Sequence, residues 1–209
     1  MRDSEASVKL RSGRRTINLM TMLLKRLFDL LVATFLLLLF LPVFFGVALA
    51  VRLTSSGPVL FQTTRVGRAN RHFQMYKFRT MRTDAPQVAT HLMPDPQAFL
   101  TPIGSFLRKS SLDELPQLMN VLKGDMSLVG PRPALFNQDD LVSLRTRAGV
   151  DSLLPGITGW AQVNGRDELP ITVKVDYDAF YLRHQSFLLD LKILGLTVIR
   201  VFLRDGVSH

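Results

Sequence analysis

LLVATFLLLLFLPVFFGVALAV, residues 30–51, contains no charged side chain and is about long enough to cross the apolar core of a bilayer as one helix. Pro42 stands near the middle of this stretch, where a proline removes one backbone hydrogen bond and bends a helix. The stretch is too long for a cleaved signal peptide, and no small-residue cleavage pattern closes it. It therefore predicts a membrane segment, which is either a spanning helix or a helix that breaks at Leu41-Pro42 and turns back.

The sequence on both sides of this stretch is rich in Lys and Arg, and short basic flanks prefer the cytosolic side of a membrane. The basic residues on the two sides are Arg2, Lys9, Arg11, Arg14, Arg15, Lys25 and Arg26, then Arg52, Arg65, Arg68 and Arg71. Together with the proline, they favour a re-entrant hairpin over a spanning helix. Lys25, Arg26 and Asp29 are then expected at the headgroup boundary, where the cations can pair with lipid phosphate. The alternative for these three residues is ordinary flanking charge.

The overall composition narrows the classes of partner. The chain has 209 residues, of which 47% are hydrophobic, with a formal net charge of +9 and no cysteine. The lack of cysteine excludes disulfides, cysteine-based zinc sites and a thiol nucleophile. A basic excess is typical of proteins that bind nucleic acid, anionic lipid or a phosphorylated substrate. No nucleic-acid-binding motif is present, so lipid and phosphate remain as the expected partners.

The rest of the chain predicts an α+β globule, mostly helical, that follows a membrane hairpin. We expect a basic tail at 1–24, the hairpin at 25–53 and a cytosolic globular domain at 54–209. The predicted strands lie in 54–61 and 71–81, where aromatic and polar residues alternate. Helices are predicted at 102–108, 112–122, 172–184 and 187–204, the last being amphipathic and lying on the membrane surface or on the core. The proline-rich segment 84–101 is predicted to be a loop.

SSLDELPQL, residues 110–118, places Asp113 beside Glu114 at the start of a predicted helix. Ser111 and Glu114 match the capping box, in which the glutamate reaches back to the serine backbone. Pro116 complicates this reading, because its ring would lie close to the Leu112 carbonyl. A carboxylate at a helix start is expected to have a lowered pKa and to be ionised, as a nucleophile or Mg²⁺ ligand requires. The pair is therefore either a helix cap or a catalytic pair.

Several basic residues stand in segments bounded by glycine or proline, where a guanidinium can hold phosphate oxygens in bidentate fashion. Lys123, Arg132 and Arg166 are the residues in such segments, and Arg108 lies five residues before Asp113. Together with Lys77 they could form the basic wall that a diphosphate requires, although each alone is typical of a solvated surface. The sequence contains no Walker loop, no Gly-x-Gly-x-x-Gly, no zinc-binding spacing and no nucleophile elbow. If the protein acts on a phosphorylated substrate, it is therefore expected to use a site that is built without any of these motifs.

Two long motifs carry a resemblance to a known family. SSLDELPQLMNVLKGDMSLVGPRP (110–133) and PGITGWAQVNGR (155–166) closely resemble the bacterial sugar transferases, which are monotopic polyprenyl-phosphate phosphoglycosyl transferases, here in the small form. KRLFD (25–29), MYKFRTM (75–81) and FLLDLKIL (187–194) are similar to the same family and occur in family order. The resemblance covers the chain from about Lys25 to Val207.

The resemblance implies transfer of a sugar 1-phosphate from a UDP-sugar to undecaprenyl (polyprenyl) phosphate, with release of UMP. Asp113 matches the nucleophile that forms a covalent phosphosugar intermediate, and Glu114 matches its partner. Both carboxylates would be associated with Mg²⁺. The basic positions that match phosphate-binding residues of the family are Lys77, Arg108, Arg132 and Arg166. Leu41-Pro42 stands where the family breaks its re-entrant helix, with Leu41 in place of the Ser that relatives carry there.

The implied location is the bacterial inner membrane, with the catalytic domain on its cytoplasmic face and membrane lipid as a partner. The reaction would be the first membrane step of surface glycan assembly, for an exopolysaccharide, capsule, O-antigen or glycoprotein. Galactose, glucose and N-acetylated sugars remain open, and a homodimer is the expected oligomer. The alternative to an enzyme is a membrane-tethered module that binds anionic lipid or a phosphorylated ligand without turnover.

Overall fold

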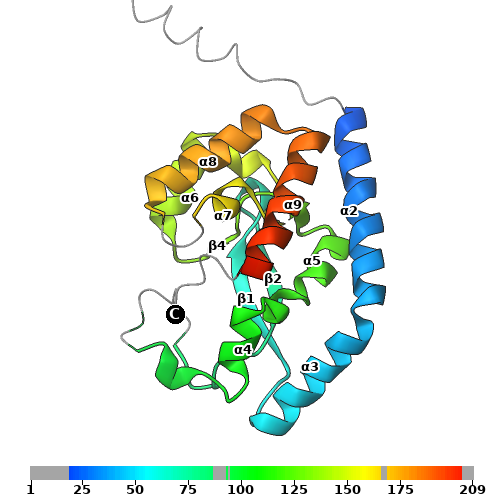
Figure 1. Ribbon diagram of the computed structural model, residues 1–209. Coiled ribbons are helices and arrows are strands. Elements are labelled where there is room, and N and C mark those ends of the chain that lie inside the picture. Colours follow the sequence, from blue (N-terminus) through cyan, green and yellow to red (C-terminus); the bar gives the residue numbers. More distant parts are fainter. Residues whose placement is uncertain (1–18, 87–92, 94, 166–168, 204–209) are drawn as a thin grey trace, which may run out of the picture.

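A computed structural model describes residues 19–86, 93, 95–165 and 169–203. Its first two elements are the apolar helices α2 (Leu19–Leu39) and α3 (Leu41–Thr54), which meet at an angle of 62° (Figure 1). Pro42 stands in the first turn of α3, where its missing N–H is tolerated but its ring prevents α2 from continuing. The predicted break at Leu41-Pro42 is thus confirmed. Within the described residues no single helix meets the length and hydropathy expected of a membrane span, although the bent pair does so jointly.

Two small sheets lie beside these helices, as expected for an α+β protein. The antiparallel sheet has the order β2-β1-β4 and the parallel pair is β3-β5. Their bounds are Leu60–Val66 for β1, His72–Phe78 for β2, Ser127–Val129 for β3, Ala134–Leu135 for β4 and Gly156–Thr158 for β5. The strand predicted in 71–81 is β2, whereas β1 overlaps the predicted 54–61 only at Leu60 and Phe61. The two strands form a hairpin, with Phe61 opposite Lys77. The hairpin places Lys77 near the end of β2.

Helices surround both sheets (Figure 1). They are α4 (Gly104–Lys109), α5 (Gln117–Lys123), α6 (Asp139–Arg147), α7 (Trp160–Val163), α8 (Ile171–His184) and α9 (Phe187–Leu203). Single 3₁₀ turns are η1 (Arg68–Asn70), η3 (Gln97–Phe99), η4 (Leu112–Glu114) and η5 (Val150–Ser152). The predicted helix at 112–122 is split into η4 and α5, while the other three predicted helices are present. The helix α6 was not predicted because Leu141 is its only buried residue, which leaves no apolar stripe in the sequence.

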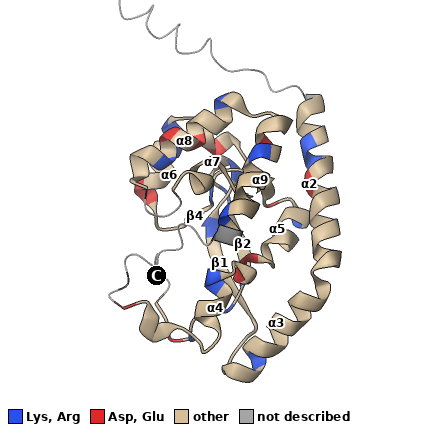
Figure 2. Ribbon diagram, viewed as in Figure 1, with Lys and Arg blue, Asp and Glu red and all other residues tan. Residues whose placement is uncertain are grey.

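The main core lies between α2, the β1–β2 hairpin, α5 and α9. Ala33 on α2, Met75 on β2, Val121 on α5 and Ile193 on α9 are all almost completely buried in it. The opposite face of α2 is apolar but exposed, with Leu31 62% and Phe35 63% accessible. Figure 2 shows few charges along α2 and α3, and none occurs in the sequence between Asp29 and Arg52. The broken helix therefore has one face packed on the globule and one apolar face without cover.

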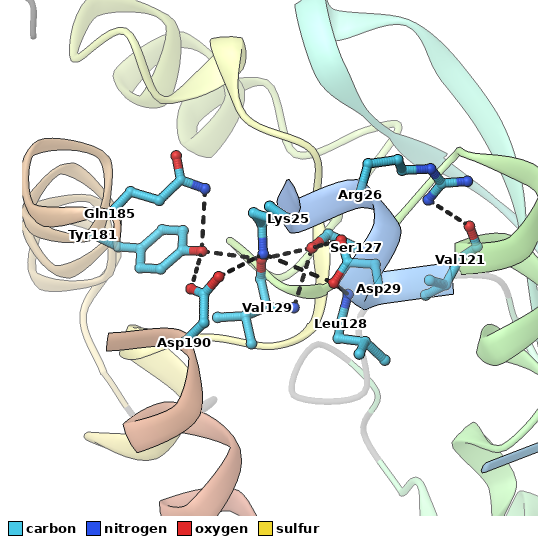
Figure 3. A network of polar contacts seen from close by, with 10 residues as sticks. All are labelled: Lys25, Arg26, Asp29, Val121, Ser127, Leu128, Val129, Tyr181, Gln185 and Asp190. Atoms are coloured by element: carbon cyan, nitrogen blue, oxygen red, sulfur yellow. Dashed lines mark hydrogen bonds and ion pairs between the residues drawn. The ribbon is translucent and has the colours of Figure 1, made fainter. Parts of the chain in front are cut away.

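A buried polar network joins α2 to α9 (Figure 3). The Lys25 ammonium donates to the Asp190 carboxylate at 2.8 Å and lies 3.9 Å from that of Asp29. The Tyr181 hydroxyl donates to the other oxygen of Asp190 at 2.6 Å. Burial raises the pKa of Tyr181, and the charge of Asp190 raises it further, so the hydroxyl stays protonated as a donor. Each charged group in this network has a partner of opposite charge or a hydrogen-bond donor.

The neighbouring residues of α2 also point into the protein. Asp29 is 1% exposed and accepts hydrogen bonds from the Ser127 hydroxyl at 2.7 Å and the Leu128 amide at 3.2 Å. Arg26 donates to the Val121 carbonyl at 2.8 Å and so satisfies the end of α5. Lys25, Arg26 and Asp29 thus fasten α2 to the globule, a role that the sequence analysis missed. Their expected placement toward lipid phosphate stays a prediction for the two cations, while the buried Asp29 carboxylate contacts protein groups only.

Candidate active site

The carboxylate pair Asp113-Glu114 stands in a tight turn rather than at a regular helix start. Ser111 adopts a left-handed conformation with φ of 56°, and the Glu114 amide donates to its carbonyl at 3.2 Å in the 3₁₀ pattern. The predicted capping box is wrong, because no side-chain cap bond forms at Ser111 and the Glu114 carboxylate contacts Lys77 instead. Pro116 has no amide hydrogen to continue the turn as an α-helix, so α5 begins only after it.

Two cations hold Glu114 and one of them also faces Asp113. Lys77 lies 2.6 Å from a Glu114 oxygen and 3.9 Å from an Asp113 oxygen. Arg132 donates to the same Glu114 oxygen at 3.2 Å. The side chains of Asp113 and Glu114 are 10% and 20% exposed, so these charges interact in a partly desolvated setting. The structure thus brings together four of the predicted site residues.

The backbone around Lys77 is fixed from α5. Asn120, which is fully buried, accepts a hydrogen bond from the Tyr76 amide at 3.0 Å and donates to the Gln74 carbonyl at 2.7 Å. The Asn120 amide therefore pairs with the free edge of β2 as a further strand would. Since Lys77 directly follows Tyr76, its ammonium is aimed from a rigid position.

Arg132 stands between Pro131 and Pro133, whose rings restrict the backbone and prevent a helix in this segment. Its carbonyl accepts a hydrogen bond from Arg145 at 2.8 Å. Arg145 in turn forms a buried ion pair with Asp178 at 2.6 Å, which ties the loop to α6 and α8. Arg132 is 39% exposed, so its guanidinium reaches both Glu114 and the solvent side of the site.

Arg108 also lies in this region, on α4. Its guanidinium donates to the Thr80 hydroxyl at 3.1 Å, and its charge favours the ionised form of Asp113. The predicted phosphate-binding residue Arg166 lies outside the described residues. Arg79, in the MYKFRTM motif, instead donates to the Pro58 carbonyl at 2.6 Å and is buried, so it supports the fold between α3 and β2.

The two carboxyl groups have opposite pKa shifts. Burial raises the pKa of Asp113 to about 6, against the opposing charge of Lys77, and the charge of Glu114 raises it as well. Burial also opposes ionisation of Glu114, but the charges of Lys77 and Arg132 outweigh it and hold the Glu114 pKa below its usual value. The predicted lowering of the Asp113 pKa by a helix start is therefore wrong. Asp113 is the more weakly stabilised carboxylate of the pair, and it is still mostly ionised above pH 7.

A cleft of about 1240 Å³ opens onto these groups. Its charged lining includes Lys77, Arg108, Asp113, Glu114 and Arg132. Apolar side chains line the same cleft, namely Val32 and Leu36 from α2, Phe40 between α2 and α3, and Leu194 and Val198 from α9. The cleft can therefore accommodate a phosphorylated compound and an apolar chain together.

A comparison of the sequence with models of known protein families identifies the family of this chain. The family model described as "Bacterial sugar transferase" matches residues 20–204, which include both carboxylates and all three described basic residues of the site. This chain belongs to the bacterial sugar transferase family. The match confirms the resemblance on which the sequence analysis relied.

Similar members of the family come from several bacteria. The chain is 47% identical to the uncharacterized sugar transferase EpsL of Bacillus subtilis, over 90% of this chain and 92% of that protein. It is 43% identical to the UDP-glucose:undecaprenyl-phosphate glucose-1-phosphate transferase of Escherichia coli, over 88% of this chain and 41% of that protein. It is 38% identical to an N-acetylgalactosaminephosphotransferase of Aeromonas hydrophila, over 84% of this chain and 43% of that protein. The chain thus spans nearly all of EpsL and about two fifths of the two transferases.

The donor atoms of this bacterial sugar transferase are compatible with Mg²⁺. Asp113 and Glu114 present hard carboxylate oxygens to the cleft, and Mg²⁺ is commonly held by one or two carboxylates together with substrate phosphates. Among the described residues there is no group of three or more carboxylate or histidine side chains that could hold a metal alone. The pair therefore fits an open site that a diphosphate completes, rather than a closed protein cage.

Proposed function

We propose that this protein transfers a sugar 1-phosphate from a UDP-sugar to undecaprenyl (polyprenyl) phosphate and releases UMP. The observation that carries the proposal is Asp113, a partly desolvated carboxylate that faces Lys77, Arg108 and Arg132 in a cleft with an apolar wall. The family membership and the activities for which its relatives are named support the same reaction class. The names of these relatives specify different sugars, glucose in one and N-acetylgalactosamine in another. The proposal therefore does not specify which sugar this protein transfers.

In the first step, an Asp113 carboxylate oxygen attacks the phosphorus that bears the sugar. The bond between that phosphorus and the bridging oxygen breaks, and UMP leaves with the electron pair. The product on the protein is an acyl phosphate that carries the sugar. Lys77 and Arg132 reduce the repulsion between carboxylate and diphosphate and stabilise the charge that develops on the phosphoryl oxygens.

In the second step, a phosphate oxygen of the polyprenyl phosphate attacks the same phosphorus. The bond to Asp113 breaks and the carboxylate is restored, which gives a polyprenyl diphosphate sugar. Because UMP departs first, the soluble and lipid substrates can use one cleft in turn. The apolar lining from α2 and α9 suits the start of the lipid chain.

The contacts of Glu114 suit a residue that assists Asp113 without forming a covalent bond to the substrate. Its low pKa and its bonds to Lys77 and Arg132 keep it ionised and fixed beside Asp113. Mg²⁺, when held by Asp113, Glu114 and the diphosphate, would withdraw negative charge from the phosphoryl group and make it a better electrophile.

We further propose that α2 and α3 form a re-entrant membrane hairpin at the cytoplasmic face of the bacterial inner membrane. The 62° bend and the basic residues on both sides support a helix that enters and leaves on one side. The outer face of α9 is also apolar, with Leu188 78% and Ile199 53% exposed, which suits a helix at the membrane surface. The site would then lie near the headgroup plane, where the lipid phosphate is found.

The test of the transferase proposal is UMP release by Asp113→Asn in membranes or detergent, with Mg²⁺, undecaprenyl phosphate and a panel of UDP-sugars. The panel contains UDP-glucose, UDP-galactose and their N-acetylated counterparts. We expect the variant to lose at least about a thousandfold in rate, as for removal of a nucleophile. The matched control is Asp176→Asn, an exposed carboxylate on α8, which should keep the wild-type rate. A wild-type protein that binds UDP-sugars but turns over none would favour the binding-module alternative.

A further inference from the structure

The segment that carries Arg132 is held through its carbonyl groups. Pro131 and Pro133 flank Arg132 and have no amide hydrogen, so neither can donate a backbone hydrogen bond to a neighbouring segment. The Pro131 carbonyl accepts a hydrogen bond from the Gly156 amide at 2.9 Å. The Arg132 carbonyl accepts one from the Arg145 guanidinium at 2.8 Å. The carbonyl of Arg132 itself is therefore held by a side chain from α6.

Asp178 fixes the plane of the Arg145 guanidinium. The Nε and Nη2 atoms of Arg145 donate to one carboxylate oxygen of Asp178 at 2.9 Å and 2.6 Å. The remaining nitrogen, Nη1, donates to the Arg132 carbonyl. The side chains of Arg145 and Asp178 are 11% and 1% exposed, so the protein encloses both. Because a guanidinium is planar and rigid, two donors on a carboxylate keep its third nitrogen in one direction.

The ion pair also joins α6 to α8, but these two helices have a separate apolar contact. Leu141 on α6 and Val175 on α8 are buried in one cluster with Ala134 of β4. The burial of two charges costs free energy that their attraction often only offsets, so such a pair is weak evidence for added stability. An apolar pair could hold the two helices equally well. It could not supply a donor to the Arg132 carbonyl.

The residue whose carbonyl is held belongs to the candidate active site. The Arg132 guanidinium donates to a Glu114 oxygen at 3.2 Å, and the Arg132 side chain is 39% exposed. A long and partly exposed side chain has many rotamers, so a fixed backbone narrows the positions that its guanidinium can reach. A displacement of about 1 Å in a group that assists a reaction can cost about a hundredfold in rate.

We propose that Arg145, held by Asp178, is a positioning residue that sets the place of Arg132 in the active site. This role rests on the proposed transferase function, in which Arg132 stabilises charge on the phosphoryl oxygens. Among the described residues, those that line the cleft include Arg132 but not Arg145, so Arg145 acts through the backbone of Arg132. Its loss weakens an interaction made in the transition state, which lowers kcat and leaves the KM for the UDP-sugar nearly unchanged.

The first test is the steady-state kinetics of Arg145→Lys, which keeps a cation beside Asp178 and leaves no buried carboxylate without a partner. We expect kcat to fall roughly tenfold, with less than about a twofold change in the KM for the UDP-sugar. In an Arg132→Ala background the same substitution should cause no further loss. The matched control is Arg147→Lys, an exposed position on α6, which should keep the wild-type kcat. An unchanged kcat, or an equal fractional loss in both backgrounds, would overturn the proposal.

The second test separates positioning from stability. Arg145→Met/Asp178→Leu removes both charges together, so the free energy of unfolding should stay close to that of wild type or rise. The kcat of this double variant should nevertheless fall at least as far as that of Arg145→Lys. Chemical denaturation in detergent measures the stability, and UMP release measures the rate. A wild-type kcat would overturn the proposal, because the apolar pair offers no donor to the Arg132 carbonyl.

A third readout needs no turnover and uses NMR of protein with isotope-labelled arginine. The side-chain N–H signals of Arg132 are identified by their loss in Arg132→Ala. They should shift or broaden in Arg145→Lys and stay in place in Arg147→Lys. Unchanged Arg132 signals in Arg145→Lys would overturn the positioning role. If these signals respond as expected but the wild-type protein transfers no sugar phosphate, the proposed function fails while the link from Arg145 to Arg132 is supported.

Discussion

Asp113 and Glu114 are adjacent in the chain but occupy different electrostatic settings. Glu114 takes the hydrogen bonds of Lys77 and Arg132, so it is the stabilised anion of the pair. Asp113 has only more distant cations, and their attraction does not offset the burial that destabilises its charge relative to water. A carboxylate of this kind is a better nucleophile than a fully paired one, because fewer bonds must be released when it attacks. The different roles of the two carboxylates therefore follow from the position of the Lys77 ammonium, which lies closer to Glu114 than to Asp113.

This setting predicts how Asp113 affects stability with pH. Its pKa of about 6 lies above the ordinary aspartate value of 3.8, so the ionised form is disfavoured on folding and stability is lost as pH rises from about 4 to above 6. Asp113→Asn, measured without Mg²⁺, should raise the free energy of unfolding above pH 7 by at most about 3 kcal/mol, since one pKa unit is worth about 1.4 kcal/mol. Near pH 4 the two proteins should be equally stable.

Chemical denaturation in detergent at pH 4 and pH 7.5 measures this difference. The control is Asp176→Asn, which should show no pH-dependent gain because the side chain is exposed. A variant that is less stable than wild type at pH 7.5 would mean that Lys77 and Arg108 stabilise the Asp113 charge by more than burial penalises it.

The elements position this pair through three proline-controlled breaks. Pro42 separates α2 from α3, Pro116 separates η4 from α5, and Pro131 with Pro133 fixes the Arg132 segment. In each case the missing amide hydrogen or the ring prevents a regular element from continuing. Apolar residues continue at helical spacing through Pro116, which predicts one helix where the structure has the turn η4 followed by α5. The structure resolves this point, since the residues on both sides pack into cores although the helix begins only at Gln117.

The bend at Pro42 makes a topological prediction. Because the chain has no cysteine, single cysteines introduced at Ser12 and at the exposed Arg71 can be labelled without background. In intact spheroplasts a membrane-impermeant thiol reagent should label neither site, and both should react after the membrane is opened. Pro42→Ala should weaken the bend and increase labelling of one site from outside. If the two sites of the wild-type chain label from opposite sides, the hairpin spans the membrane.

At the scale of the whole molecule, one cleft joins a charged site to an apolar surface. The exposed apolar faces of α2 and α9 lie on elements that also line the cleft, while Lys25 and Asp190 join these two helices from inside. The two exposed apolar helix faces therefore belong to elements that also form the wall of the cleft. With the membrane placement that we propose, a lipid substrate would reach Asp113 along these same two helices. The expected homodimer stays a prediction.

The sequence predicted the features that depend on local pattern. The broken helix, the β1–β2 hairpin and the carboxylate pair with its basic residues could be derived from proline placement, alternation and the family motifs. The features that it missed depend on contacts between distant segments. Lys25 reaches Asp190 across 165 positions, and the raised pKa of Asp113 comes from burial that no local pattern encodes.

The most direct test of the account is a single-turnover experiment with the wild-type protein, a reactive UDP-sugar and Mg²⁺, without polyprenyl phosphate. A covalent mechanism predicts a burst of UMP that approaches one equivalent per protein. Rapid proteolysis and mass spectrometry should then find the mass of one sugar phosphate on the peptide that contains Asp113, and undecaprenyl phosphate should remove it. Absence of UMP until the lipid is added, or a sugar phosphate on Glu114 instead, would contradict Asp113 as the nucleophile.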